Sequence, residues 1–292
     1  MNRHDNEFAR AIEQALGEPP ASVSALAGGC VGDVRLVTTR GGDKLVAKFD
    51  GSGASALDVE GRSLTFLREI GQLPTPRVIA ASPTLLLLAY IDATDPITDT
   101  AQQHAAALLA QLHSVTPQDN PHRFGFHCNT RIGGLEQPNG WLDDWPAFFA
   151  RRRLVAMADL ASRAGQLPAP IRKRVDSLAQ RLPEFLDSRP RAALVHGDVW
   201  SGNVLCKAGT IAAFIDPAPY FGNAEVELAF ITLFNTFSQP FFDAYQQRRP
   251  IARGFFETRR HVYNIYPLLV HVHLFGGGYI GQLDATLRCI GF

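Results

Sequence analysis

The first third of the chain contains short runs of strand-forming hydrophobic residues that are separated by glycine-rich turns. Three such runs, DVRLVTT, KLVAKFD and TLLLLAYID, lie within residues 22–92, and Gly41-Gly42-Asp43 separates the first two. This pattern predicts strands joined by tight turns. Between the second and third runs, the stretch ALDVEGRSLTFLREIG places its apolar residues at largely helical spacing and ends near Gly71. We therefore expect a small antiparallel sheet with one helix packed against it.

From about Asp99 onward the hydrophobic pattern becomes mainly helical. Helical spacing is found in TAQQHAAALLAQLHSV and in the segments around 145–164, 171–187, 224–247 and 254–275. Strand-like runs in this part are AALVHGD, VLCKA and TIAAFIDPA. The sequence thus predicts an α+β protein with an N-terminal lobe and a larger, mainly helical C-terminal lobe, the outline of a two-lobed, protein-kinase-like fold. The predicted lobes are residues 1–92 and 93–292.

Composition and charge narrow the range of functions. The 292 residues, 46% of them hydrophobic and 19% charged, are enough to bury a substantial core. Lys plus Arg equals Asp plus Glu at 28 each, which argues against a nucleic-acid partner. The polar N-terminus does not resemble a signal peptide, and the longest apolar runs fall short of the roughly 20 residues of a membrane span. Four cysteines without CxxC spacing argue against zinc and fit a reducing, cytoplasmic location.

The stretch LVHGDVWSGNVL carries the clearest chemical signal. Asp198 follows His-Gly directly, and Asn203 comes five residues later, with Trp200 between them. A phosphoryl transfer requires a carboxylate that faces the acceptor hydroxyl and oxygen ligands for a metal ion. Asp198 is the candidate for the first role, and Asn203 is a candidate ligand of Mg²⁺, which prefers such hard oxygen atoms. The structural alternative is an ordinary polar turn after a buried strand.

A second candidate metal ligand, Asp216, ends the buried run IAAFI and precedes Pro217. Carboxylates at the end of a strand often cap a helix, but with Asp198 and Asn203 already placed we favour the metal-ligand role. Glu225 and Glu227 follow in GNAEVELAF, where acidic residues favour the positive end of a helix dipole. We interpret these two glutamates as structural.

Candidate nucleotide contacts come from the predicted sheet. The stretch LAGGCVGDV could cradle phosphates through the backbone at Gly28, Gly29 and Gly32, although three close glycines also suit a simple hairpin turn. Lys48 lies in the strand-like run LVAKF, and Glu60 lies early in the next predicted helix. Kinases use such a lysine–glutamate pair to hold the phosphates of ATP. The structural alternative for Lys48 is an exposed residue at the edge of the sheet.

With these residues in hand, the chain resembles the fructosamine kinases (ketosamine-3-kinases), which belong to the aminoglycoside phosphotransferase and protein-kinase-like group. The resemblance runs nearly end to end and is carried by the segments GGCVGDVRLV, VAKF, FGFHCNTRIGGLEQPNGWLDDWPAFFARRRL, LVHGDVWSGNVL, IDPAPYFGNAEVELAF and LFGGGYIGQ. Two positions depart from the pattern common in that family. Ala224 stands where an arginine is frequent, and Ala89 stands where a glutamate is frequent.

The resemblance implies ATP- and Mg²⁺-dependent phosphorylation of the sugar 3-hydroxyl of ketosamines, free or protein-bound, in a protein-deglycation role. It implies that Asp198 is the catalytic base and that Asn203 and Asp216 hold the metal ion. Lys48 and Glu60 would be the phosphate-binding pair. The resemblance further implies that Trp200 contacts the ketosamine, where an indole face suits the C–H face of a sugar. Trp141 and Trp145 are further aromatic candidates, but core packing explains them equally well.

Several alternatives stay open on sequence grounds. The acceptor could be another hydroxylated amine, such as an aminoglycoside or a choline-like compound, because these enzymes share the same catalytic parts. A nucleotide-binding pseudokinase is a further alternative, although every expected catalytic side chain is present. The resemblance also implies a redox-sensitive thiol at Cys30, so the protein could be a monomer or a homodimer linked through that residue. A small buried cysteine with an inert thiol is the alternative there.

Overall fold

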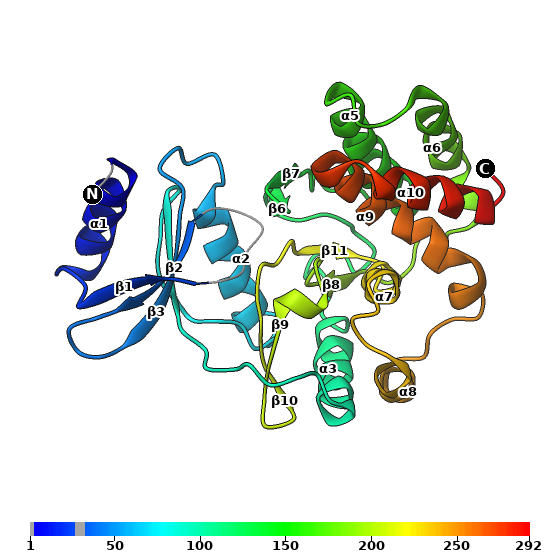
Figure 1. Ribbon diagram of the computed structural model, residues 1–292. Coiled ribbons are helices and arrows are strands. Elements are labelled where there is room, and N and C mark those ends of the chain that lie inside the picture. Colours follow the sequence, from blue (N-terminus) through cyan, green and yellow to red (C-terminus); the bar gives the residue numbers. More distant parts are fainter. Residues whose placement is uncertain (1–2, 27–32) are drawn as a thin grey trace.

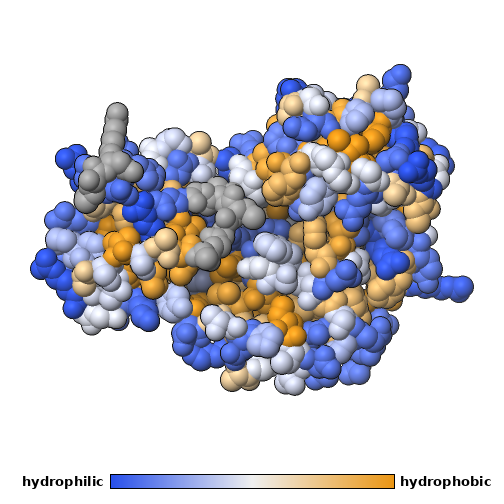
Figure 2. Space-filling view, in the orientation of Figure 1, coloured by the Kyte–Doolittle hydropathy of each residue, from blue (hydrophilic) through white to orange (hydrophobic). Residues whose placement is uncertain are grey.

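The computed structural model describes residues 3–26 and 33–292. It has the two parts that the hydrophobic pattern predicts: a sheet with helices on its two faces, and a larger, mainly helical part (Figure 1). On the face seen in Figure 2, hydrophobic surface gathers toward the middle of the molecule and over part of the helical lobe, while the outer ends are mostly polar. None of the helices in the described residues combines the length and the apolar character that a membrane crossing requires.

The N-terminal sheet has five strands in the order β1-β2-β3-β5-β4, and every neighbouring pair is antiparallel. The predicted glycine-rich turn joins β2 to β3, and Gly42 in it has a φ of +89°, a backbone conformation that glycine adopts without strain. The three strand-forming runs of the sequence are β2, β3 and β5. The strands are β1 (Ser22–Ala25), β2 (Asp33–Thr38), β3 (Lys44–Phe49), β4 (Val78–Ala81) and β5 (Leu85–Ala89).

Side-chain alternation along β3 places its residues on two different faces. Leu45, Ala47 and Phe49 join the hydrophobic cluster that includes Phe8 and Ile12 of α1 (Arg3–Leu16). Lys48 lies on the opposite face, which α2 (Leu57–Glu69) covers. The predicted helix is therefore α2, whereas α1 was not predicted. The period-2 pattern of β3 is thus what directs the lysine toward the helix that carries Glu60.

The larger lobe is built mainly from helices that bury the principal hydrophobic core. The segment predicted around residues 145–164 contains a π-helical stretch between two α-helical ones, and the segment 224–247 is two helices rather than one. The bounds are α3 (Asp99–Leu112), α4 (Trp145–Phe148), η1 (Phe149–Val155), α5 (Ala156–Arg163), α6 (Ala169–Arg181), η2 (Leu182–Glu184), α7 (Glu225–Leu233), α8 (Gln239–Arg248), η4 (Phe255–Arg259), α9 (Arg260–Phe275) and α10 (Gly278–Cys289).

Short antiparallel strand pairs lie between this helical core and the sheet lobe. The predicted runs AALVHGD, VLCKA and TIAAFIDPA supply β8, β9 and β10, and the remaining strands were not predicted. Strand β9 pairs with β10, β8 with β11, and β6 with β7. The bounds are β6 (Thr130–Ile132), β7 (Leu135–Gln137), β8 (Ala193–Val195), η3 (Ser201–Asn203), β9 (Val204–Lys207), β10 (Thr210–Phe214) and β11 (Tyr220–Gly222).

Candidate active site

The loop that leaves β8 presents Asp198, and its backbone is tightly constrained. Gly197 has a φ of +88°, and a Cβ atom at this position would lie 2.1 Å from the carbonyl oxygen of Ala218. Only glycine fits such a close approach of two backbone segments. The fully buried ring of His196 accepts the backbone N–H of Asp198 at Nδ1 over 3.3 Å. The residues on the N-terminal side of Asp198 therefore hold this carboxylate in one position.

Asp198 and Asn203 lie together, as the motif predicts. The side-chain amide of Asn203 donates hydrogen bonds of 2.9 Å and 3.0 Å to the backbone and side-chain oxygens of Asp198. Burial, and secondarily the nearby charge of Asp216, raises the pKa of Asp198 to about 8. Asp198 is therefore a partly buried carboxyl group with a raised proton affinity, a property that is common among titratable residues of functional sites.

Lys48 connects the sheet lobe to the end of β10. Its ammonium group lies 2.7 Å from Oε1 of Glu60 and 2.5 Å from Oδ1 of Asp216. Burial alone would lower the pKa of Lys48, but the two carboxylates outweigh burial and hold the pKa above its ordinary value. The predicted pairing of Lys48 with Glu60 is therefore confirmed. The direct contact with Asp216 was not predicted, and it places a permanent cation beside a candidate metal ligand.

Backbone hydrogen bonds join the loop after β8, which carries Asp198, to the loop after β10, which carries Asp216. The N–H of Ile215, next to Asp216, donates to the carbonyl oxygen of Asn203 over 3.0 Å. The N–H of Ala218 donates to the carbonyl oxygen of His196 over 2.9 Å. Asp216 has a φ of +54°, a left-handed conformation that is uncommon for a residue other than glycine and often marks a functional position. The loops after β8 and β10 therefore form one unit at the junction of the lobes.

The side-chain oxygen atoms of this unit suit the coordination of a hard divalent cation. Both side-chain hydrogens of Asn203 point to Asp198, which leaves its amide oxygen as an acceptor. The carboxylate of Asp216 supplies a second hard oxygen ligand, of the kind that Mg²⁺ binds together with waters and phosphate oxygens. Across residues 3–26 and 33–292, no three His, Cys, Asp or Glu side chains are grouped as a complete metal site. Asn203 and Asp216 together thus offer two hard oxygen atoms to a divalent cation.

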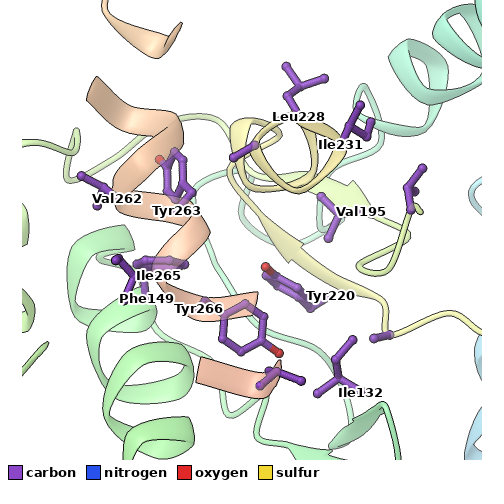
Figure 3. Close-up of a cluster of buried hydrophobic side chains, with 14 of the residues drawn as sticks. Ile132, Phe149, Val195, Tyr220, Leu228, Ile231, Val262, Tyr263, Ile265 and Tyr266 are labelled. Carbon is purple, nitrogen blue, oxygen red and sulfur yellow. The ribbon is translucent and has the colours of Figure 1, made fainter. Parts of the chain in front are cut away.

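A small cavity of about 30 Å³ opens beside Asp198 on the helical side. Figure 3 shows part of its wall, where the rings of Tyr220 from β11 and Tyr266 from α9 lie near Ile132. The wall is mostly apolar, with a few polar groups, which is the usual character of a small-molecule site. One member, His271 of α9, was not among the candidate site residues of the sequence. The cavity lining is contributed by β6, the Asp198 loop, β11, α7 and α9.

Glu227 binds the backbone of the loop that carries Asp198. Its Oε1 accepts the backbone N–H of Gly197 over 2.7 Å, and its Oε2 lies 2.9 Å from Nε2 of His113. The other ring nitrogen of His113 lies 2.7 Å from the hydroxyl of Tyr245. Burial alone would raise the pKa of Glu227, but His113 and its other partners outweigh burial and lower the pKa. An ionised, buried carboxylate therefore anchors the backbone beside Asp198.

The structural interpretation of the two glutamates was correct, but the reason given was incomplete. Glu225 forms a bidentate ion pair with Arg259, with both contacts at 2.6 Å. Glu227 is 2% exposed and binds the Asp198 loop rather than merely favouring a helix dipole. The acidic residues in the first turn of α7 could not reveal this contact, because the contact depends on how α7 packs against a loop 30 residues earlier.

The three tryptophans occupy different environments. Trp200 is 37% exposed and its ring lies against Gly202, where an added Cβ would come within 2.4 Å of the indole. Trp145 is fully buried and donates from its indole nitrogen to the hydroxyl of Tyr263 over 3.1 Å, as expected for core packing. Trp141 stacks on Phe221 with ring centroids 6.0 Å apart. Of the three, Trp200 is the one beside Asp198 that remains available to a ligand.

The structure thus brings together Lys48, Glu60, Asp198, Asn203 and Asp216, and it places Trp200 next to them. The candidate phosphate-binding glycines Gly28, Gly29 and Gly32, and the candidate redox thiol of Cys30, lie outside the described residues. Their assignments stay predictions, as does the division of the chain into lobes at residues 92 and 93.

Comparison with known proteins agrees with this arrangement. Residues 4–290 match the family model described as fructosamine kinase. A probable ketoamine kinase of Vibrio parahaemolyticus is 34% identical over 238 residues, which cover 80% of each chain. The crystal structure of a candidate fructosamine-3-kinase of Thermobifida fusca has a TM-score of 0.84 at 28% identity and covers 98% of both chains.

A more distant structure supports the fold alone. An aminoglycoside phosphotransferase in complex with ADP and hygromycin B has a TM-score of 0.67 at 18% identity, over 98% of this chain and 99% of its own. The predicted protein-kinase-like fold is therefore confirmed. Because the family model spans nearly the whole length, and the relatives are matched over most of theirs, this chain belongs to the fructosamine kinase family.

Proposed function

We propose that the protein transfers the γ-phosphoryl group of ATP to the sugar 3-hydroxyl of a ketosamine. The observation that carries this proposal is the convergence of Asp198, Asn203, Asp216 and Lys48 at the junction of the two lobes. Membership of the fructosamine kinase family supports the ketosamine as the acceptor. A role in protein deglycation follows, because a phosphate on the 3-hydroxyl makes the adduct labile.

Asp198 is assigned as the general base. Its carboxylate is held by Asn203 and by the backbone around His196, so that it faces the cavity where an acceptor hydroxyl can enter. An acceptor hydroxyl hydrogen-bonded to this carboxylate is held in the orientation for attack, and its proton passes to Asp198 as the new bond to phosphorus forms. With its pKa raised to about 8, Asp198 is largely protonated in the free protein at neutral pH, and the divalent cation that arrives with ATP would favour its ionised form, which is the base.

Asn203 and Asp216 are assigned as ligands of Mg²⁺, and Lys48 is assigned to the non-transferred phosphates. Bound MgATP would supply the phosphoryl group together with a divalent charge that neutralises the transferring oxygens. Glu60 keeps the ammonium of Lys48 directed into the site through their 2.7 Å contact. Trp200 is assigned to the C–H face of the sugar, because its partly exposed ring adjoins Asp198.

A panel of acceptors tests this proposal. ADP release would be measured with ribulosyl-lysine, fructosyl-lysine, an aminoglycoside and choline, each at saturating MgATP. We expect turnover of at least one ketosamine and none of the other two classes. Turnover of the aminoglycoside or choline with inert ketosamines would contradict the proposed acceptor, and nucleotide binding without any turnover would indicate a pseudokinase.

A further inference from the structure

Four aromatic side chains form a continuous surface at the helical side of the candidate active site, which we call the aromatic shelf: Phe234, His271, Phe275 and Tyr279. The ring of His271 lies at its centre, with centroids 4.9 Å from Phe234, 5.5 Å from Phe275 and 4.8 Å from Tyr279. Phe275 and Tyr279 also contact each other, with centroids 5.9 Å apart. The shelf is thus one group of touching rings that joins the end of α7 to α9 and α10.

The shelf is continuous with the cavity at Asp198. His271 belongs to the cavity lining together with Asp198 and Phe230, and Phe230 contacts Phe234 with ring centroids 5.1 Å apart. The shelf therefore begins at His271, in the wall of the cavity that Asp198 also lines.

Core packing accounts for part of Tyr279 but does not explain the outermost ring, Phe275. Phe275 is 59% exposed, the largest exposure among the large hydrophobic side chains of the described residues. Single exposed apolar residues are common, but an exposed phenylalanine at the end of a ring stack that starts in a ligand cavity is typical of a binding surface.

The shelf also carries no charge at neutral pH. Burial lowers the pKa of His271, and its Nδ1–H donates to the carbonyl oxygen of Pro267 over 2.8 Å, so the ring is neutral. The faces of Phe and Tyr rings attract organic cations and cover hydrocarbon chains. Such a surface fits an alkyl chain attached to a protonated amine, and it does not fit a phosphate or a carboxylate.

The shape of a ketosamine matches this layout. The proposed phosphate acceptor is the 3-hydroxyl, and the amine is joined to C1, close to C3 along the sugar chain. The cavity of about 30 Å³ has room for a hydroxyl-bearing group but not for a whole acceptor. With the 3-hydroxyl at Asp198, the amine and the chain that it carries must therefore lie outside the cavity.

We propose that the aromatic shelf binds the amine-bearing arm of the acceptor, that is, the lysyl side chain and the peptide that follows it. This inference rests on the proposed ketosamine 3-kinase function and extends it to substrate choice. The shelf favours adducts on long or peptide-borne amines over adducts on small amines, with Phe275 and Tyr279 as the residues that discriminate between them.

The test compares two ribulosyl adducts, one of methylamine and one of Nα-acetyl-lysine amide, with wild-type protein and Phe275→Ala. Phe275 is largely exposed, so we expect the variant to fold with an unchanged Tm. We expect KM for the acetyl-lysine adduct to rise about tenfold with kcat nearly unchanged, which corresponds to the loss of part of one ring contact. KM for the methylamine adduct should stay within a factor of about two, on the order of ordinary surface effects.

Phe256→Ala is the matched control, because Phe256 is 40% exposed on η4, makes edge-to-face contacts with Phe242 and Phe255, and does not line the cavity. It should leave both KM values unchanged. If Phe275→Ala changes KM equally for the two adducts, or changes neither KM, the shelf proposal is overturned. The proposed kinase function would still stand in that case. If the wild-type protein phosphorylates neither adduct, both proposals fail.

Discussion

The ammonium nitrogen of Lys48 lies 2.5 Å from Oδ1 of Asp216, so that a strand of the sheet lobe is ion-paired with the loop after β10. The same nitrogen lies 2.7 Å from Glu60, and the Lys48 side chain is only 9% exposed. Lys48 therefore holds two partners in place: the carboxylate of Asp216, which we assign to metal binding, and helix α2, which carries Glu60. Lys48 would have to share this position with nucleotide phosphates during turnover.

Replacement of this cation should weaken nucleotide binding. We expect Lys48→Met to reduce ATP affinity and to lower kcat/KM by about 10²-fold or more, because the phosphates lose a fixed charge in a partly desolvated site. Lys173→Met, at an exposed position on α6, is the matched control and should behave as wild type. Calorimetric titration with MgATP would measure the affinity, and an affinity equal to that of wild type would remove Lys48 from the phosphate site.

A methyl group at position 197 should disable the site through the backbone. The Cβ of Gly197→Ala would lie 2.1 Å from the carbonyl oxygen of Ala218, so the loop that carries Asp198 must move. A displacement of about 1 Å can reduce a positioned reaction by about 10²-fold. Gly17→Ala is the control, since Gly17 has a similar φ of +79° but nothing within 4 Å of the added atom. Steady-state kinetics should show a loss in the first variant only, and comparable activity in both would argue against the constraint.

The contact between Glu227 and Gly197 predicts that a substitution of Glu227 lowers the catalytic rate but leaves nucleotide affinity nearly unchanged. Glu227→Leu leaves the buried N–H of Gly197 without an acceptor, at a cost of about 1–3 kcal/mol in stability. We expect kcat to fall while ATP affinity, which depends on Lys48, changes little. Glu227→Gln keeps an acceptor oxygen at the same place and should recover most of kcat. Identical kinetics for the two variants would show that the hydrogen bond does not position Asp198.

The elevated pKa of Asp198 predicts a stability difference that depends on pH. Burial and the charge of Asp216 raise this pKa from 3.8 to about 8, so the folded protein retains a proton that the unfolded chain has released. The contribution of this group to stability is complete below about pH 4 and is lost as the pH rises through about 8. Asp198→Asn cannot ionise and does not suffer this loss. Its Tm relative to wild type should therefore increase between about pH 5 and about pH 8.5, and a difference that does not vary with pH would contradict the raised pKa.

The sequence predicted those parts of the site that depend on local pattern. The octapeptide HGDVWSGN identified Asp198 and Asn203, and strand alternation together with a following helix identified Lys48 and Glu60 as a pair. The contact between Asp198 and Asn203 lies within one loop, and the contact between Lys48 and Glu60 joins a strand to the next helix. Both are therefore local in the sequence.

The parts that the sequence did not predict depend on packing between distant segments. Lys48 and Asp216 are 168 positions apart, and no periodicity relates them. His271 lines the cavity only because α9 packs beside the Asp198 loop. Helix α10 was not predicted because it begins within a run of three consecutive glycines, which locally favour a loop. Each of these features is decided by tertiary contacts rather than by local propensity.

The most direct test of the central claim is to locate the new phosphate on a ketosamine product. Ribulosyl-lysine labelled with ¹³C in the sugar would be incubated with MgATP and either wild-type protein or Asp198→Asn, and the product would be examined by ³¹P and ¹³C NMR. We predict phosphorus coupling at C3 and its neighbours with the wild-type protein, and a rate lower by about 10²-fold or more with Asp198→Asn. Phosphate at another hydroxyl, or a rate for Asp198→Asn equal to that of the wild-type protein, would contradict this account.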